Sequence, residues 1–187
     1  MSDVSLRPAT AADAEAVAVI WWEGWRLGHL GHVPEALVAV RTPESFRARA
    51  AARIADTVVA IAGPAHKQAD AMPAADAMAD QAGVPGGQVA GFVMVVRDEV
   101  EQVYVAAAHR GSGVAGVLLA EAERLVAAGG YGRAWLAVVA GNVRARRFYE
   151  RSGWVDDGLF DYAAAVPGGV LAVPAHRYLK RVTTSPA

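Results

Sequence analysis

A glycine-rich turn between two apolar runs constrains the fold of this chain more than any other feature. The turn spans Gly111 to Gly116 and reads GSGVAG; it follows the β-branched run EVEQVYV and opens the helical run VAGVLLAEAERLVAAGG. Small residues at the start of a helix let consecutive backbone N–H groups face one point, where the helix dipole favours an anion. The sequence therefore predicts a strand–turn–helix unit with a phosphate-sized cradle at the turn.

The remaining apolar periodicities predict a mixed α/β chain. Capping residues predict further helices after Thr10 and after Asn142. Another helix is predicted to start at Thr42-Pro43 and to run to about residue 55. Apolar runs predict strands over residues 4–7, 56–63, 88–98, 99–105, 133–140, around 154–155 and over 175–182. This order is typical of a central sheet flanked by helices, and a length of 187 residues predicts a single domain over 1–187.

Residues 62–88 interrupt this pattern between two predicted strands. The segment is rich in alanine, proline, glycine and aspartate, lacks strand periodicity and is longer than a usual hairpin connection. We interpret it as an insertion, either a mobile arm or a small helical excursion over residues 74–81.

Composition excludes several classes of protein. With 54% hydrophobic and 20% charged residues the chain is not intrinsically disordered, and a net charge of -1 gives no global attraction to nucleic acid or anionic lipid. The absence of cysteine excludes disulfides and thiolate catalysis, and the histidines lack the spacing of a metal site. We therefore expect no metal and no nucleic-acid partner. Because the chain has no long apolar run, we also expect no membrane partner, and we expect a cytoplasmic location.

The glycines of the turn also match G-x-G-x-x-G, the fingerprint of a dinucleotide-binding Rossmann turn. Two features argue against that interpretation. The residues AAAHR separate the preceding strand from Gly111, and the next strand, WLAVVA, lacks the acidic residue that would bind a ribose.

A second motif follows one helix and one strand later, where N-x-x-A-x-x-F-Y-x-x-x-G-W begins at Asn142. Read from Arg110, the turn itself is R-x-x-G-x-A. With both motifs at this spacing, residues 4–181 resemble the GCN5-related N-acetyltransferase (GNAT) superfamily, which transfers acetyl groups from acetyl-CoA to amines. The resemblance implies a mixed, mostly antiparallel central sheet flanked by helices, with acetyl-CoA as the acyl donor.

The resemblance also implies which residues hold the donor. Backbone groups of Val103, Tyr104 and Val105 are expected to pair with its pantetheine arm like an added strand, and its pyrophosphate is expected at the glycine-rich turn. The donor-binding residues implied in this way are Val103, Tyr104, Val105, Arg110, Gly111, Ser112, Gly113, Val114, Ala115, Gly116 and Asn142.

In the family, a tyrosine at the position of Tyr149 commonly protonates the departing thiolate. Tyr149 lies two helical turns after Asn142, so both side chains are expected on one helix face. Transfer of a proton from a phenol with a pKa near 10 to a thiolate whose thiol has a pKa near 8.5 is unfavourable by about 2 kcal/mol. The site must therefore shift the pKa of one of the two groups. The alternative is that Tyr149 only packs the helix.

The acceptor amine must lose a proton, because an amine near pKa 10 is only about one part in a thousand neutral at pH 7. Glu99 and Glu101 are candidate bases, since strand alternation places both on the face of Val103. The alternative is a solvated pair on an edge strand. Many relatives carry a glutamate where this chain has Ala137, a difference that disfavours N-terminal peptide acetylation.

The side chains of Trp21, Trp25, His29 and His32 would share one helix face, on the side where the family binds its acceptor. Glycines at positions 24, 28 and 31 argue that this helix does not stay regular, and an aromatic stripe is more often core. The family's topology implies that Asp157, in the segment VDDGLFDY, lies near the same opening. Aromatic faces and carboxylates together suit a small cationic amine.

We therefore predict an acetyl-CoA-dependent N-acetyltransferase with Tyr149, Glu101 and Glu99 as catalytic residues. Direct attack in a ternary complex is expected, since the chain has no cysteine to form an acyl-enzyme. One alternative is an acyltransferase with another acyl group or a peptide acceptor, and another is a non-catalytic CoA-binding or partner-binding module. A homodimer is left open.

Overall fold

A seven-stranded sheet is the frame of the structure, a computed structural model that describes residues 4–63 and 87–183. The strands follow the order β1-β2-β3-β4-β5-β7-β6, and all neighbours are antiparallel except β4 and β5. The mixed, mostly antiparallel sheet predicted from the sequence is therefore confirmed. The strands are β1 (Val4–Pro8), β2 (Thr57–Ala62), β3 (Gln88–Val96), β4 (Glu99–Val105), β5 (Arg133–Val139), β6 (Val155–Val166) and β7 (Gly169–Arg181).

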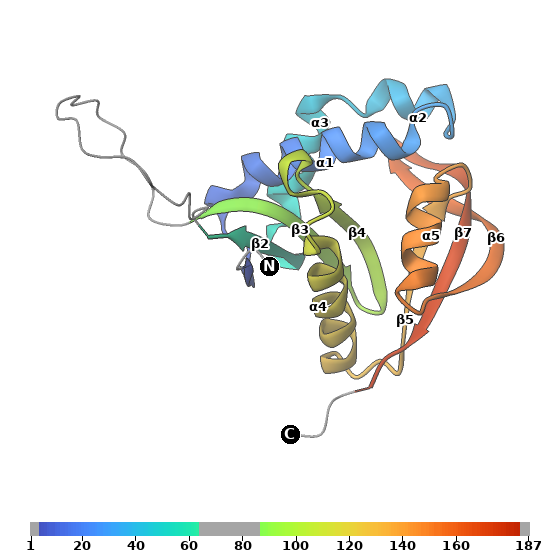
Figure 1. Ribbon diagram of the computed structural model, residues 1–187. Helices are drawn as coiled ribbons and strands as arrows, with labels where there is room; N and C mark the ends of the chain where they lie inside the picture. The colour runs from blue at the N-terminus through green and yellow to red at the C-terminus, as the bar shows by residue number, and fades with distance from the viewer. Residues whose placement is uncertain (1–3, 64–86, 184–187) are drawn as a thin grey trace, which may run out of the picture.

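Helices cover both faces of this sheet (Figure 1). Two predicted caps are present: Thr42 Oγ1 accepts the Ser45 N–H, and Asn142 Oδ1 accepts the Ala145 N–H at 3.1 Å. No helix in the described ranges is long and apolar enough to cross a bilayer. The α-helices are α1 (Ala14–His29), α2 (Glu35–Val40), α3 (Pro43–Ala52), α4 (Val114–Ala128) and α5 (Val143–Arg151).

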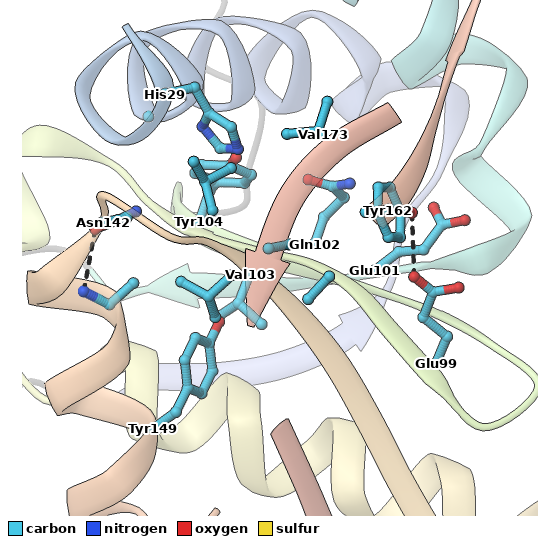
Figure 2. Close-up of a pocket in the computed structure, with 16 residues that line it drawn as sticks. His29, Glu99, Glu101, Gln102, Val103, Tyr104, Asn142, Tyr149, Tyr162 and Val173 are labelled. Atoms are coloured by element: carbon cyan, nitrogen blue, oxygen red, sulfur yellow. Dashed lines mark hydrogen bonds between the residues drawn. The ribbon is translucent and has the colours of Figure 1, made fainter. Parts of the chain in front are cut away.

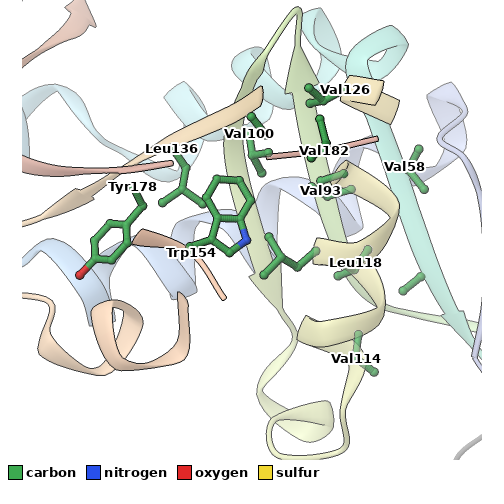
Figure 3. Packing of buried hydrophobic residues seen from close by; sticks show 14 of the residues in the cluster. Val58, Val93, Val100, Val114, Leu118, Val126, Leu136, Trp154, Tyr178 and Val182 are labelled. Carbon is green, nitrogen blue, oxygen red and sulfur yellow. The ribbon is translucent and has the colours of Figure 1, made fainter. Parts of the chain in front are cut away.

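Two apolar cores lie on opposite faces of the sheet. One core joins α4 to the sheet around Leu118 and Trp154 (Figure 3). The other joins α1 and α3 to the opposite face around Trp21, Phe46 and Phe92, and the ring centroids of Trp21 and Phe46 are 5.4 Å apart. Because both faces are covered, β2 is buried along its whole length, which explains its continuous apolar sequence.

The strands β4 and β5 diverge soon after they meet. In the described part of the chain they pair at one position, Glu99 with Trp135, although β4 continues to Val105 and β5 to Val139. The edge of β4 that faces β5 therefore carries backbone groups without a strand partner. This opening in the middle of the sheet contains the candidate site.

A β-bulge at Glu101 changes the direction of the side chains along β4. The pairing with β3 skips Glu101, which is an extra residue in β4. As a result Val103 packs into the core that contains α4, which we call the α4 core, whereas Tyr104 packs into the core that contains α1, the α1 core. Tyr162, whose hydroxyl is hydrogen-bonded to Glu99, also packs into the α1 core. The prediction that Glu99 and Glu101 share the face of Val103 is wrong, because side-chain alternation does not continue through a bulge.

The helix α1 stays regular through His29, and the prediction that its glycines interrupt it is wrong. A Cβ atom at Gly24 would overlap the ring of Tyr104, and one at Gly28 would lie 2.7 Å from Nδ2 of Asn142. The glycines therefore let the helix approach β4 and the start of α5. Their cost in helix propensity, about 1 kcal/mol each, is offset by close packing beside the candidate site.

The sequence pattern missed α2 and most of the β6–β7 hairpin. The outer half of β6 contains three consecutive alanines, and the outer half of β7 contains a glycine and a proline; all three residue types are poor indicators of strand. The second predicted helix also ends earlier than expected, at Ala52, and is followed by a 3₁₀ turn over Ile54–Asp56. Most of the predicted insertion, including its helical excursion over 74–81, lies outside the described residues.

Candidate active site

A cavity of about 140 Å³, which we call the strand cavity, lies at the opening between β4 and β5. Figure 2 shows side chains from α1, β4, α5 and β6 converging on it. Ala137 lies in its wall, so this cavity lacks the glutamate that many relatives carry there. Its lining residues are Gly24, His29, Glu99, Glu101, Gln102, Val103, Tyr104, Ala137, Val138, Val139, Asn142, Ala145, Tyr149, Tyr162, Val173 and Ala175.

Tyr149 extends from α5 into the strand cavity. Its ring packs against Trp154 and Tyr178, with centroids 6.2 and 6.0 Å away, which fixes the ring's direction. Its hydroxyl points toward Val103 (Figure 2) and has no hydrogen-bond partner among the described residues. Burial raises the pKa of Tyr149, so the phenol keeps its proton at neutral pH. Packing thus accounts for the ring but leaves the hydroxyl available.

Asn142 caps α5 and faces the same cavity as Tyr149. Because its Oδ1 accepts the Ala145 N–H, its Nδ2 is directed toward Gly28 of α1. The amide therefore offers a donor in the gap between α1 and α5. The spacing of two helical turns does bring Asn142 and Tyr149 to one cavity.

Glu99 is a half-buried carboxylate at the other end of the strand cavity. Its Oε1 accepts a hydrogen bond of 3.1 Å from the hydroxyl of Tyr162. Burial, with the charge of Glu101 nearby, raises the pKa of Glu99 to about 7. A carboxylate with this pKa is partly ionised at neutral pH and can accept a proton from a cationic amine.

Glu101 is held by a cation. Its Oε2 lies 2.8 Å from Nη2 of Arg53, whose Nε also donates to Asp56 Oδ2 at 2.8 Å. The interpretation of Glu99 and Glu101 as a solvated edge pair is wrong, because β4 lies inside the sheet between β3 and β5. The two carboxylates nevertheless differ, since only Glu101 has an arginine as its ion-pair partner among the described residues.

The glycine-rich turn lies at the N-terminus of α4, after β4. Gly113 has φ 91° and precedes the first helical residue, Val114, whose buried side chain anchors the turn in the α4 core. The backbone N–H groups of Gly113, Val114 and Ala115 have no acceptor in the described part of the chain. No atom lies within 4 Å of a Cβ built at Gly113, so the space beside the start of α4 is open at this residue. The turn can therefore hold an anion of the size of a phosphate.

A second cavity of about 380 Å³, which we call the helix cavity, lies between α1, α2, α3 and the β6–β7 hairpin. It adjoins the strand cavity, because His29, Glu101, Gln102, Val139, Tyr162 and Val173 line both. The other residues that line the helix cavity are Trp21, Trp25, Val33, Leu37, Arg41, Phe46, Arg49, Ala52, Arg53, Ala163, Ala164 and Ala165.

Three residues predicted on the acceptor side line the helix cavity. Trp21 is only 1% exposed and belongs mainly to the α1 core. Trp25 stacks on His29, with ring centroids 5.1 Å apart, and its carbonyl accepts the His29 Nδ1–H at 2.9 Å. Burial lowers the pKa of His29 to about 4, so this ring is neutral at pH 7. Within residues 4–63 and 87–183, no cluster of three or more histidine, aspartate or glutamate side chains could hold a metal ion.

The other two predicted acceptor residues lie elsewhere. His32 is exposed beyond the end of α1, beside Gly141, and lines neither cavity. Asp157 lines a separate cavity beside Arg133 and Arg177. The prediction that both residues reach the acceptor side is wrong, because α1 ends at His29 and β6 carries Asp157 away from the opening.

Five polar residues of the site were not singled out from the sequence: Gln102, Tyr162, Arg41, Arg49 and Arg53. A local signal exists for two of them, because Phe46, Arg49 and Arg53 follow helical spacing along α3 and its C-cap residue. An arginine on the buried side of a helix is uncommon and could have indicated a charged cavity wall.

The fold and the site together define a class of protein, and comparison with known families assigns it. The acetyltransferase (GNAT) family matches residues 52–154, more than half of the chain. The protein therefore belongs to the GNAT family of acetyltransferases, which use acetyl-CoA as the acyl donor. A comparison with functionally curated proteins gives no match.

Solved structures of this family share the fold along the whole chain. A GCN5-related N-acetyltransferase from Rhodopseudomonas palustris is 20% identical over 97% of this chain and 98% of its own, with a TM-score of 0.64. The PaiA N-acetyltransferase from Thermoplasma acidophilum, solved with coenzyme A, is 16% identical over 96% and 99%, with a TM-score of 0.61. The protein yncA from Salmonella typhimurium, solved with its cofactor acetyl-CoA, is 18% identical over 100% and 98%, with a TM-score of 0.59.

Proposed function

We propose that this acetyltransferase transfers the acetyl group of acetyl-CoA to a primary amine by direct attack, with both substrates bound. The observation that carries the proposal is the shared wall of the two cavities, because adjoining spaces allow a donor and an acceptor to be held together. The chain also has no cysteine that could form an acetyl-enzyme.

The residues on the donor side fit acetyl-CoA. The free edge of β4 at Val103, Tyr104 and Val105 offers backbone partners for the amides of a pantetheine arm. The open N–H groups from Gly113 to Ala115 suit its pyrophosphate, and Arg110 at the start of the turn adds a positive charge. A donor held in this way would bring its thioester between Asn142 and Tyr149.

Two proton transfers are assigned to the protein. The donor supplies a thioester carbon, to which the amine nitrogen forms a C–N bond while the C–S bond breaks and CoA leaves as a thiol. Glu99 accepts the proton that the ammonium loses before attack, and Tyr149 gives its phenolic proton to the sulfur. The second proton, which the nitrogen loses once the C–N bond has formed, passes to solvent. Solvent then restores the proton to Tyr149 and removes the one on Glu99.

Burial affects both partners of the second proton transfer. It raises the pKa of Tyr149, which alone would make the phenol a weaker acid. A thiolate formed in the same apolar space is also destabilised, so its pKa rises as well. Proton transfer from phenol to thiolate, which is unfavourable between the free groups, therefore need not be unfavourable in the strand cavity.

We assign the base to Glu99 rather than Glu101. Oε2 of Glu101 is already engaged by Nη2 of Arg53, at 2.8 Å. Glu99 has the hydroxyl of Tyr162 as its partner and a pKa near that of a working base at neutral pH. Glu101 then orients the acceptor from the shared wall.

Replacing Glu99 with glutamine is expected to remove the rise in kcat near pH 7 and to leave only a rise at higher pH. Below its pKa of about 7, Glu99 is protonated and cannot accept a proton, so wild-type kcat should rise as the pH increases through 7. The variant should be about 10- to 100-fold slower at pH 7 and should regain rate above about pH 8, where more of the amine is already neutral. The measurement is kcat as a function of pH.

Glu101→Gln provides the comparison for this experiment. It should alter KM for the amine but keep the rise in kcat near pH 7, because Glu99 is still present. If the rise in kcat near pH 7 were lost in Glu101→Gln and retained in Glu99→Gln, the base would have been assigned to the wrong carboxylate.

The charge of the acceptor is the part of the sequence prediction that loses its support. A small cationic amine was expected from aromatic faces together with carboxylates such as Asp157, but Asp157 lies outside both cavities. Arg41, Arg49 and Arg53 line the helix cavity instead. We therefore propose a small primary amine without the requirement for further positive charge.

A further inference from the structure

The helix cavity carries more positive than negative charge. Arg41, Arg49 and Arg53 line it, and Glu101 is the one acidic residue among its described lining residues. Glu101 is already ion-paired with Arg53, at 2.8 Å. Neither Arg41 nor Arg49 forms an ion pair with any acidic side chain in the described part of the chain. Two positive charges in this wall therefore lack a counter-ion within the described ranges.

Both of these guanidinium groups are partly withdrawn from water. Burial lowers the pKa of Arg49, and burial together with the charge of Arg49 lowers the pKa of Arg41 to about 10. Both remain protonated at pH 7. Holding two half-buried like charges together without a counter-ion is unfavourable in the free protein. A ligand that brings negative charge would remove this penalty.

Structural contacts occupy only part of each guanidinium. Nη2 of Arg41 donates to the carbonyl of Ala165 in β6 at 2.7 Å, and the Arg49 group lies 4.9 Å from the ring centroid of Trp21. Nε of Arg49 is buried and has no hydrogen-bond partner among the described residues. The remaining N–H groups suit a carboxylate or another oxyanion, which guanidinium binds through paired hydrogen bonds.

Negative charge lies where the helix cavity meets the strand cavity. Glu101 and Tyr162 line both cavities, and Tyr162 is hydrogen-bonded to Glu99 (Figure 2). A ligand with its anionic group at Arg41 and Arg49 would therefore extend an ammonium group toward two carboxylates. The charges of the two ends match those of a zwitterion.

We propose that the acceptor is a small zwitterion, a primary amine that also carries a carboxylate or another oxyanion, the class to which free amino acids belong. Arg41 and Arg49 bind the oxyanion, and the amine faces Glu99. This inference rests on the proposed function, because it names the acceptor of the same reaction.

Matched acceptors test the proposal. Each common amino acid is assayed with acetyl-CoA beside its carboxamide and its decarboxylated amine, and aminoalkyl phosphonates form a further arm. The preferred acid should exceed both of its neutralised counterparts in kcat/KM by about 10- to 100-fold, because only the acid pairs with the guanidinium groups. A preference for the phosphonate arm would identify a tetrahedral oxyanion, and a preference for amino acids a carboxylate.

Arg49→Gln is the variant that locates the anion. It should lower kcat/KM for the preferred acid by about 10- to 100-fold while changing that of its carboxamide by less than about threefold. Arg47→Gln is the matched control on α3, because Arg47 is exposed, pairs with Glu15 at 3.0 Å and lines neither cavity. The control should keep the wild-type preference, and thermal melts of both variants verify folding.

Turnover and binding separate this inference from the proposed function. The same acid and carboxamide are titrated calorimetrically into the protein saturated with CoA, with and without Arg49→Gln. Acid binding that depends on Arg49, without turnover of any amine, would support the anion site and contradict the proposed function. Equal use of acid and carboxamide, or equal loss of both in Arg49→Gln, would overturn the zwitterion proposal and leave amine acetylation standing.

Discussion

Tyr149→Phe is expected to lower kcat by about 10- to 1000-fold while leaving acetyl-CoA affinity almost unchanged. The substitution removes the one group that we assign as proton donor to the departing sulfur. It keeps the ring, which packs against Trp154 and Tyr178 and fixes the wall of the strand cavity. Single-turnover rates measure the chemical step directly, and calorimetry measures the affinity.

Tyr178→Phe is the matched control for loss of a buried phenol. Tyr178 is fully buried beside α5, and its hydroxyl donates to Glu150 at 3.0 Å, but it does not line either cavity. Its loss should lower stability without changing the single-turnover rate. An unchanged rate in Tyr149→Phe, with chemistry limiting, would remove Tyr149 from the mechanism.

Gly113→Glu is expected to lower acetyl-CoA affinity by about 100-fold or more. The new carboxylate would stand in the open space before the N–H groups of Val114 and Ala115, where the pyrophosphate is expected. Calorimetric titration with acetyl-CoA measures the loss.

Gly113→Ala separates charge from backbone strain in this experiment. Gly113 has φ 91°, so any side chain there strains the backbone, and alanine carries the same strain without the charge. A Cβ at this position touches no other atom within 4 Å, so alanine creates no clash there. Unaltered affinity in a folded Gly113→Glu protein would contradict the assignment of the turn as the phosphate cradle.

The parts of the fold that follow local rules could be predicted from the sequence. The glycine-rich turn before α4 and the Asn142 cap of α5 depend on residues close together in the chain, and both are present as expected. Two such motifs at a family's spacing also indicated a mixed, mostly antiparallel sheet flanked by helices. The Asn142 and Tyr149 pair could be placed on one cavity because helix periodicity alone relates them.

The parts that depend on distant contacts could not be predicted. The bulge at Glu101 arises from the register between β3 and β4, and Gly24 is explained only by the approach of Tyr104. The charge of the helix cavity depends on Arg41 and Arg49 meeting the β6–β7 hairpin, whose alanine-rich sequence gave little indication of its length. These contacts are long-range in sequence, and they decide the acceptor side of the site.

The central claim is most directly tested by the initial rate of CoA release, with acetyl-CoA and the preferred amine varied together. Direct transfer in a ternary complex predicts amine-dependent release of CoA, an N-acetylated product and reciprocal plots that intersect. Parallel plots would indicate an acetyl-enzyme and contradict direct attack. Folded protein that binds acetyl-CoA but releases no CoA with any amine of the panel would contradict the enzymatic account and favour a CoA-binding module.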